Sequence, residues 1–328
     1  MPDLTEQEQQ VVVAMVEAHA RAMALLTTNL TALVFRMFRS FSGWYDDRAT
    51  RGLSRRVSHV VLAAQLQVAL ATAAYLEHVW AILRLPRGET VRLPDLLRLA
   101  DPIEVYERPV REFRRLRVVE TPGEDPDLTV EEAAERAAER AVTIVERDLG
   151  LAMREAARQK MANTATVIGY RRIIHPELSR SGTCGLCIVA ADRVYEKGEL
   201  LPMHENCKCT VLPVTEDADP GLRMNAEDLR RLYDEAGGND AAALKRTRYK
   251  VVEHGELGPT LVEQGRRIRS GRQAILDARD PAQRALGELA VLEPSLEALE
   301  RRAARGEDVT APMAWQRSRV EALRRLVA

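Results

Sequence analysis

The sequence predicts a mainly α-helical protein: an N-terminal bundle of long helices, a small α+β module that holds a cluster of cysteine and histidine, and a helical C-terminal tail. Three observations predict this class. Long segments repeat apolar residues every three or four positions. Aromatic residues make up only 4% of the chain, so the core must be aliphatic and Ala-rich, which suits helices better than sheets. All four cysteines lie between Cys184 and Cys209.

The N-terminal region, residues 1–128, is expected to contain two long helices, over 5–41 and about 54–85, that form an antiparallel hairpin. A heptad-like seam marks the first: Val12, Val16, His19, Met23, Leu26, Leu30, Leu33, Met37 and Phe41. The second keeps the same rhythm from Val57 to Ile82. It also carries another apolar stripe, which indicates burial on more than one side: Leu62, Leu66, Leu70, Trp80 and Leu83.

A long connecting helix is expected over residues 129–163. Thr129, followed three positions later by Glu132, forms a capping box, in which each side chain bonds the other residue's backbone N–H. The helix that follows has an Ala-rich stripe, which allows neighbouring helices to approach closely: Ala134, Ala137, Ala141, Ile144, Val145 and Ala152.

The α+β module is expected over residues 164–262. Its β-branched and aromatic segment beginning at Thr164 predicts one or two strands, and Cys209–Val214 predicts another. Asn225 and Asp228 indicate the start of a short helix, and 248–262 gives a weak strand-and-turn signal. The tail, 263–328, is expected to end in two Arg/Glu-rich helices broken near Gly306 and Pro312.

Charge and the N-terminus restrict the class of protein. The 48 basic and 49 acidic residues leave almost no net charge, which excludes a uniformly basic protein that coats nucleic acid. The first ten residues are polar and acidic, unlike a secretory signal. No segment approaches about 18 uninterrupted apolar residues, so we expect no transmembrane helix. Clustered thiols in a reducing cytoplasm are metal ligands more often than disulfides.

The cysteine segment has the spacing of a zinc site. Cys184-x2-Cys187 supplies two ligands with a suitable bite, and His204-x2-Cys207-x-Cys209 supplies up to three more. Since zinc takes four ligands, one of the last three residues can be spare. In an extended backbone Cys207 and Cys209 point to opposite faces, whereas a turn would let both bind. Chance clustering of buried cysteines and a pair of disulfides remain as alternatives.

This segment also resembles a known family. The order C-x2-C, then D-x2-Y, then L-P-x-H-x-N-C-K-C-T-V-x-P is similar to the signature of the phage head-morphogenesis proteins named after gene F of phage Mu, the MuF-like proteins. The matched positions are Cys184, Cys187, Asp192, Tyr195, Pro202, His204, Asn206, Cys207, Cys209, Thr210, Val211 and Pro213. Glu205 and Lys208 replace the Pro and Arg usual in the family. The flanking residues, roughly 165–262, and the Arg-rich composition resemble versions from phages of actinobacteria.

The resemblance implies a minor capsid protein, present in a few copies inside the head near the portal and assembled in the host cytoplasm. It implies partnership with the portal, major capsid and scaffold proteins, a role in procapsid assembly and in DNA packaging or ejection, and no membrane partner. Related actinophage proteins are also described as capsid maturation proteases, which is the alternative function. The Cys/His cluster would then be a structural zinc knot.

The residues themselves identify no catalytic group for a protease. Ser179 or Ser181 with His175 or His204 is conceivable, as is a cysteine nucleophile, but no acidic partner stands out and thiolates bound to metal are quenched. His175 is also a candidate to serve the cysteine site. Of the other histidines, His19 and His78 lie in helical seams and are expected to pack, whereas His59 is expected to pack or to lie on the helix surface. His254 is placed in a Gly-flanked turn with no visible partner. A basic stretch could touch DNA or an acidic portal face, although solvated surface is the simpler interpretation: Arg266, Arg267, Arg269 and Arg272.

Overall fold

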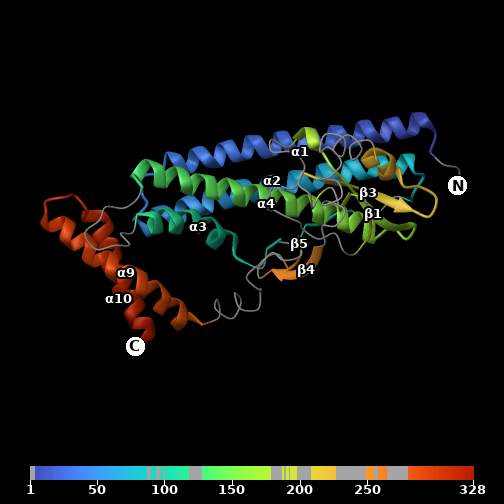
Figure 1. Cartoon of the computed structure of the whole chain (residues 1–328). Helices are drawn as coiled ribbons and strands as arrows, with labels where there is room; N and C mark the ends of the chain where they lie inside the picture. The colour runs from blue at the N-terminus through green and yellow to red at the C-terminus, as the bar shows by residue number, and fades with distance from the viewer. Residues whose placement is uncertain are drawn as a thin grey trace, which may run out of the picture. The chain divides into compact units, whose positions relative to one another are not determined.

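A computed structural model confirms the mainly helical fold with a small α+β part (Figure 1). The residues that it describes are 4–86, 90–93, 97–98, 100–117, 128–178, 187, 190–191, 193–197, 208–226, 249–254, 258–263 and 280–328. The helices are α1 (Glu6–Arg39), α2 (Asp47–Ile82), α3 (Pro102–Leu116), α4 (Val130–Ala162), α9 (Pro281–Ala304) and α10 (Thr310–Val327), with a 3-10 turn η1 (Pro176–Leu178). The strands are β1 (Val167–Ile173), β2 (Val194–Glu196), β3 (Thr210–Thr215), β4 (Tyr249–His254) and β5 (Gly258–Glu263).

Contacts divide the chain into two compact units that do not follow chain order. Unit 1 comprises Met1–Leu30, Val61–Leu97 and Val145–Ile268. Unit 2 comprises Thr31–Val60, Arg98–Ile144 and Arg269–Ala328. This grouping is by contact, whereas the boundaries expected above are by sequence, and those boundaries stay a prediction.

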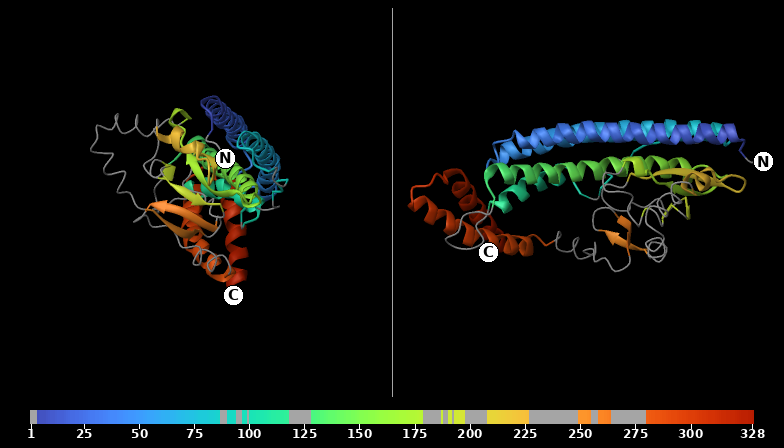
Figure 2. Two further views of the ribbon diagram at one scale, coloured as in Figure 1. Left: turned by 90° about the vertical axis from the view of Figure 1, so that its right-hand side faces the viewer. Right: turned by 45° about the horizontal axis from the view of Figure 1, so that its top comes forward.

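The core of unit 1 brings three helices onto a sheet. α1, α2 and the C-terminal half of α4 lie side by side, with β1 and β3 against α4 (Figure 2). Glu8 pairs with Arg84 and His19 stacks on Tyr75, so α1 and α2 run antiparallel here, as expected. The buried members of this core are Val12, Val16, Tyr75, Leu76, Val79, Trp80, Leu83, Ala157, Met161, Val167, Tyr170, Ile173, Val211 and Leu212.

Capping boxes start two of the long helices. At α4 the predicted box is present: the backbone N–H of Thr129 donates to Glu132 at 2.8 Å, and the backbone N–H of Glu132 donates to the Thr129 hydroxyl at 3.2 Å. Thr5 and Glu8 make the same pair of bonds at α1, at 2.9 and 3.2 Å. Every member of the predicted Ala-rich stripe of α4 is buried.

The larger sheet has the order β2-β1-β3, and both pairings are antiparallel. Pro213, which cannot donate a backbone hydrogen bond, is tolerated because β3 is an edge strand. Gly169 is required in β1, because a Cβ there would come within 2.5 Å of the Tyr195 carbonyl oxygen. The weak signal at 248–262 proves to be a second sheet, the β4–β5 hairpin.

The expected seam of α1 is wrong beyond Leu30. Leu33 is 39% exposed, whereas Val34 and Phe38 are fully buried. A seam repeating every 3.5 residues drifts by about 20° per heptad on a helix with 3.6 residues per turn. Over three heptads this drift brings Val34, instead of Leu33, onto the buried face. α1 therefore packs as an ordinary helix and not as one helix of a supercoiled pair.

The prediction that an extra apolar stripe of α2 is buried is confirmed only in part. Trp80 and Leu83 are buried, but Leu62, Leu66 and Leu70 are 40 to 56% exposed, so α2 is not covered on that side among the described residues. By length and composition alone, α1 and α2 each contain a window apolar enough to cross a membrane, with 28% and 39% of it buried. Core helices of proteins outside membranes meet the same criterion, so the absence of a transmembrane helix stays a prediction.

One helix is added and one expectation is corrected. The sequence predicts two long helices in residues 1–128, and the structure adds α3 there. Asp101 caps it by accepting from the N–H groups of Ile103 and Glu104, and Pro102 occupies its first turn. Asn225 does not begin a helix: a helical segment runs from 220 to 226 in the described residues, and Asn225 lies inside it.

The tail forms the predicted helix pair, α9 and α10, in unit 2. The two helices share a small apolar core: Ala285, Leu289, Leu292, Val320 and Leu323. The break between them falls at Gly306, as expected, where a positive φ of 85° suits glycine. Pro312 lies in the first turn of α10, where a proline is tolerated.

Candidate functional site

The structure describes two of the predicted metal ligands. Cys187 and Cys209 are both buried, at 5% and 6% exposure. Cys184, His204 and Cys207 lie outside the described residues, as do Ser179 and Ser181. Within the described part of the chain no three His, Cys, Asp or Glu residues gather as a metal site would require, but that part holds too few of the candidates for a test. Zinc binding therefore stays a prediction.

Buried polar contacts bind the segment that contains Cys187 to β1. The Arg171 guanidinium lies between the Asp219 carboxylate, at 3.0 Å from Nε, and the Ala191 carbonyl, at 3.3 Å from Nη1. The Asn225 amide donates to the carbonyl oxygens of Arg172 and Ala191 at 2.7 and 2.8 Å. Because these bonds satisfy buried carbonyls from two separate segments, they hold β1 and residues 190–191 in a fixed arrangement.

The middle and the end of the family-like motif meet at one residue of β1. Tyr195, in β2, stacks on Tyr170 with ring centroids 5.3 Å apart. Pro213, in β3, is the strand partner of Tyr170 on its other side. Tyr170 is fully buried. Residues that the sequence separates by the whole second half of the motif therefore lie on the two sides of one residue in the same sheet.

His175, a candidate from the sequence, is at the centre of a buried polar chain. Its Nε2 lies 2.9 Å from Thr210 Oγ1, and its Nδ1 lies 3.0 Å from Glu177 Oε1. His175 and Thr210 are 5% and 2% exposed, whereas the Glu177 side chain is 53% exposed. The sequence indicated neither partner of His175, because Thr210 comes from β3, far along the chain, and a single Glu two residues away carries no signal.

His19 is buried near His175, as a packing residue. Its ring stacks on Tyr75 at 4.4 Å, nearly parallel, and the Tyr75 hydroxyl donates to the Val211 carbonyl at 3.2 Å. Burial, with a smaller contribution from His175, lowers the pKa of His19 to about 4, so the ring is neutral at physiological pH. Burial also raises the pKa of Tyr75. The expectation that His78 packs in the α2 seam is wrong, since His78 is exposed, and His59 lies on the surface.

A small cavity of about 50 Å³ in unit 1 reaches Thr210. Its wall is mostly apolar, with Lys208 and Glu146 as charged members whose Nζ and Oε1 atoms lie 3.8 Å apart. The full lining is Ala20, Met23, Ala24, Thr27, Val68, Glu146, Leu149, Gly150, Met153, Leu178, Lys208 and Thr210.

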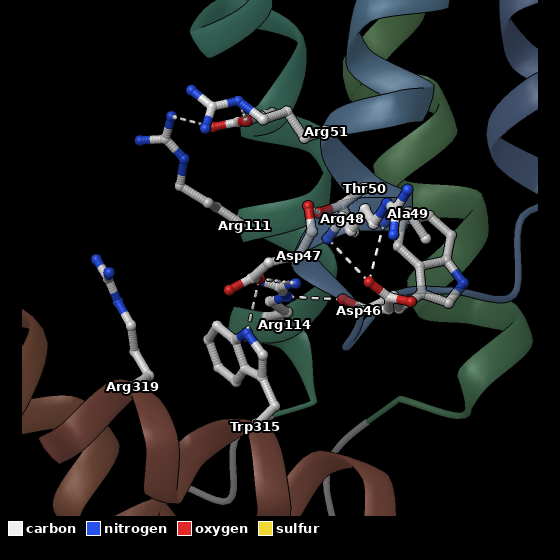
Figure 3. A network of polar contacts seen from close by, with 12 residues as sticks. Asp46, Asp47, Arg48, Ala49, Thr50, Arg51, Arg111, Arg114, Trp315 and Arg319 are labelled. Carbon is white, nitrogen blue, oxygen red and sulfur yellow. Dashed lines mark hydrogen bonds and ion pairs between the residues drawn. The ribbon is translucent and has the colours of Figure 1, made fainter. Parts of the chain in front are cut away.

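Unit 2 contains a different polar cluster, which the sequence did not indicate (Figure 3). The Arg114 guanidinium lies 4.0 Å from the Trp315 ring centroid and pairs with Asp47 at 2.9 Å. Trp315 Nε1 donates to the same Asp47 oxygen at 2.9 Å. Trp44 stacks on Phe113 at 4.1 Å, and its carbonyl accepts from Arg114 Nε. Burial lowers the pKa of Arg114, opposed by Asp47, and the group stays charged at physiological pH.

Comparison with known proteins adds no relative: no family model, no curated protein and no solved structure matches the chain. Two further candidates from the sequence contribute nothing to the site. His254 is the last residue of β4, and the basic stretch of Arg266, Arg267, Arg269 and Arg272 lies outside the described residues.

Proposed function

We propose that this protein is a bacteriophage minor capsid protein of the MuF-like type, acting in head morphogenesis at the portal. The observation that carries the proposal is the Cys/His motif at residues 184–213, which joins several residue types at fixed spacing. The meeting of Tyr195 and Pro213 on Tyr170 supports it, because the middle and the end of the motif belong to one folded sheet.

The motif would hold a structural zinc ion. Cys184, Cys187, His204, Cys207 and Cys209 are the candidate ligands, of which four would bind. The two described thiols are buried, as ligands in a closed structural site are. β1 and β3 are buried against the helices of unit 1, whereas β2, next to the cysteine segment, has three residues and is largely exposed. Zinc would supply folding free energy to this part of the chain.

Metal analysis tests the zinc proposal. Protein purified without chelator should contain about one zinc per chain, and Cys187→Ser and Cys209→Ser should each lower that content. The variant Thr183→Ala changes a residue beside Cys184 that is not a zinc-ligand type, so it is the matched control and should keep its zinc. Protein that folds with no metal would contradict the proposal.

The long helices and the C-terminal pair offer surface for the portal, major capsid and scaffold proteins. The exposed Leu62, Leu66 and Leu70 on α2 are apolar side chains of the kind that such contacts cover. The virion interior, near the portal, is the proposed location, with a few copies per head. Local contact with packaged DNA belongs to the same proposal.

Co-expression with the portal, scaffold and major capsid genes of the same phage genome tests the function. Purified procapsids should contain the chain in a few copies, measured by quantitative mass spectrometry. Omitting the portal gene should reduce its incorporation. Procapsids that assemble with the portal and exclude the chain would contradict the proposal. The same samples test the alternative, a maturation protease, because the capsid or scaffold protein would shorten only when the chain is present.

A further inference from the structure

The contacts of His175 have the order of a nucleophile, a base and an orienting acid. An ionised carboxylate only accepts hydrogen bonds, so the 3.0 Å contact with Glu177 Oε1 assigns the imidazole proton to Nδ1. Nε2 is then the acceptor, and the Thr210 hydroxyl at 2.9 Å donates to it. A hydroxyl in contact with an imidazole, which a carboxylate orients from behind, is the arrangement that activates serine nucleophiles, and Thr210 presents the same kind of hydroxyl.

The cavity gives this hydroxyl residue a space for a reactant. Thr210 is only 2% exposed, but it lines the 50 Å³ cavity together with Lys208 and Leu178. Lys208, which pairs with Glu146, places a cation in the same wall. The neighbouring wall residues Met23 and Leu149 are apolar, so the cavity suits a short acyl chain and not a folded polypeptide.

We propose that Thr210, His175 and Glu177 form an acyl-transfer site for small esters. Thr210 Oγ1 bonds to the carbonyl carbon as its proton passes to His175 Nε2, while Glu177 holds Nδ1–H. The ester C–O bond breaks, and the leaving alcohol departs with the proton from His175, or as its anion when it is acidic. Water then attacks the acyl-threonine ester, the carboxylic acid leaves, and Thr210 regains its hydroxyl proton. Thr210 and His175 are the catalytic residues, and Glu177 is a positioning residue.

This site shares Thr210 with the family-like motif, but the acyl transfer goes beyond the proposed capsid role, and it differs from the expected protease in its nucleophile and in the size of its substrate. Either can fail without the other, because procapsid incorporation needs no acyl transfer. The serine candidates of the protease hypothesis, Ser179 and Ser181, lie outside the described residues, and the acyl-transfer site rests on neither of them.

Acetylation by p-nitrophenyl acetate tests the proposal on the full chain. Nitrophenolate release is followed by absorbance, and samples quenched in acid are mapped by peptide mass spectrometry. The acetyl group should be found on Thr210. Thr210→Val, which keeps the side-chain shape, should abolish that label, whereas Thr210→Ser should keep the residue labelled. His175→Gln should slow labelling by roughly 100-fold, the usual contribution of a general base.

Two controls separate chemistry from structure. Thr215→Val removes another buried hydroxyl of β3 and should leave the rate unchanged. Glu177→Gln should slow labelling with an unchanged thermal midpoint, and Glu177→Asp should restore part of the rate. An acetyl group found only on lysine or cysteine overturns the proposal, and so does a His175→Gln variant that labels Thr210 at the original rate. If Thr210→Val does not fold, the mapping of the unsubstituted chain decides the question by itself.

Discussion

Each unit of the molecule contains a stacked ring pair of nearly the same geometry. His19 and Tyr75 in unit 1 lie 4.4 Å apart at 3°, and Trp44 and Phe113 in unit 2 lie 4.1 Å apart at 11°. The pairs differ in chemistry. The unit 1 pair includes a ring that can gain a proton, and burial strongly disfavours that proton, whereas the unit 2 pair has no group that titrates in this range. Contact geometry therefore does not determine how a packed pair responds to pH.

The largest expected effect is at the unit 2 pair. Trp44→Ala removes a 4% exposed side chain from its stack on Phe113 and leaves a cavity. We expect a loss of about 3–5 kcal/mol in the free energy of unfolding, measured by urea denaturation at pH 7. Trp315→Phe keeps a ring and removes only the indole bond to Asp47, so it should cost roughly 1 kcal/mol. Equal losses in the two variants would contradict the central role of the Trp44 stack.

The unit 1 pair should respond to acid. Folding lowers the pKa of His19 from its ordinary value of 6.5 to about 4, so the unfolded chain binds the extra proton first as pH falls. Stability from this group is complete above pH 6.5 and is lost as pH falls towards 4, by roughly 3 kcal/mol in all. His19→Phe retains the stack without titrating. Its stability should therefore fall less between pH 7 and pH 4 than that of the unsubstituted chain.

Urea denaturation at each pH measures this difference, and the Trp44 pair is the internal reference. Protection against hydrogen exchange in residues 6–30 and 61–82, taken relative to the intrinsic exchange rate at each pH, should fall in acid more in the unsubstituted chain than in His19→Phe. If the stability of the two proteins depends on pH in the same way, His19 is not the group that weakens unit 1 in acid.

A second titratable group of unit 1 should show a smaller effect. The Lys160 side chain is 2% exposed, and its Nζ lies 2.6 Å from Glu77 Oε1, which is on a half-exposed side chain. Glu77→Gln leaves a buried ammonium without this counter-charge and should cost about 1–2 kcal/mol, discounted for solvent around Glu77. Lys160→Met should cost less, since it removes the charge that needs a partner.

Glu17→Gln is the matched control for that experiment. Glu17 and Arg21 form an exposed pair at 3.2 Å, so its loss should change stability by only a few tenths of a kcal/mol. If Glu77→Gln changes the free energy of unfolding equally little, burial of Lys160 does not strengthen its ion pair with Glu77.

The smallest effects should be the same in both units. Thr5→Ala and Thr129→Ala each remove the hydroxyl of a capping box and should each cost about 1 kcal/mol, measured by thermal unfolding. The bonds that they break are nearly identical, at 3.2 Å to the backbone N–H of Glu8 and of Glu132. A large difference between the two variants would mean that fraying at the chain end, and not the cap itself, sets the cost.

Much of the helical framework was predictable because its signals are local. The Thr129–Glu132 box and the Ala-rich stripe of α4 depend on residues within a few turns of one another, and both are confirmed. α3 was missed because its cap, Asp101 with Pro102, is embedded in a stretch of mixed charge with no long apolar rhythm. The candidate site was predictable in part: the sequence selected His175 and the cysteines as candidates, Thr210 only as a position of the family-like motif, and Glu177 not at all.

Apart from the start of α2, which lies at Asp47 and not near residue 54, the sequence by itself determined where the long helices begin, that the chain is mainly helical, and which short segment concentrates the thiols. These follow from hydrogen bonds and periodicities within one element. Only the tertiary structure decided that Leu62, Leu66 and Leu70 stay exposed, that His19 is buried beside Tyr75, and that Thr210 meets His175. Each of these depends on which distant segment covers a given face, and no pattern within a single helix or strand encodes that choice.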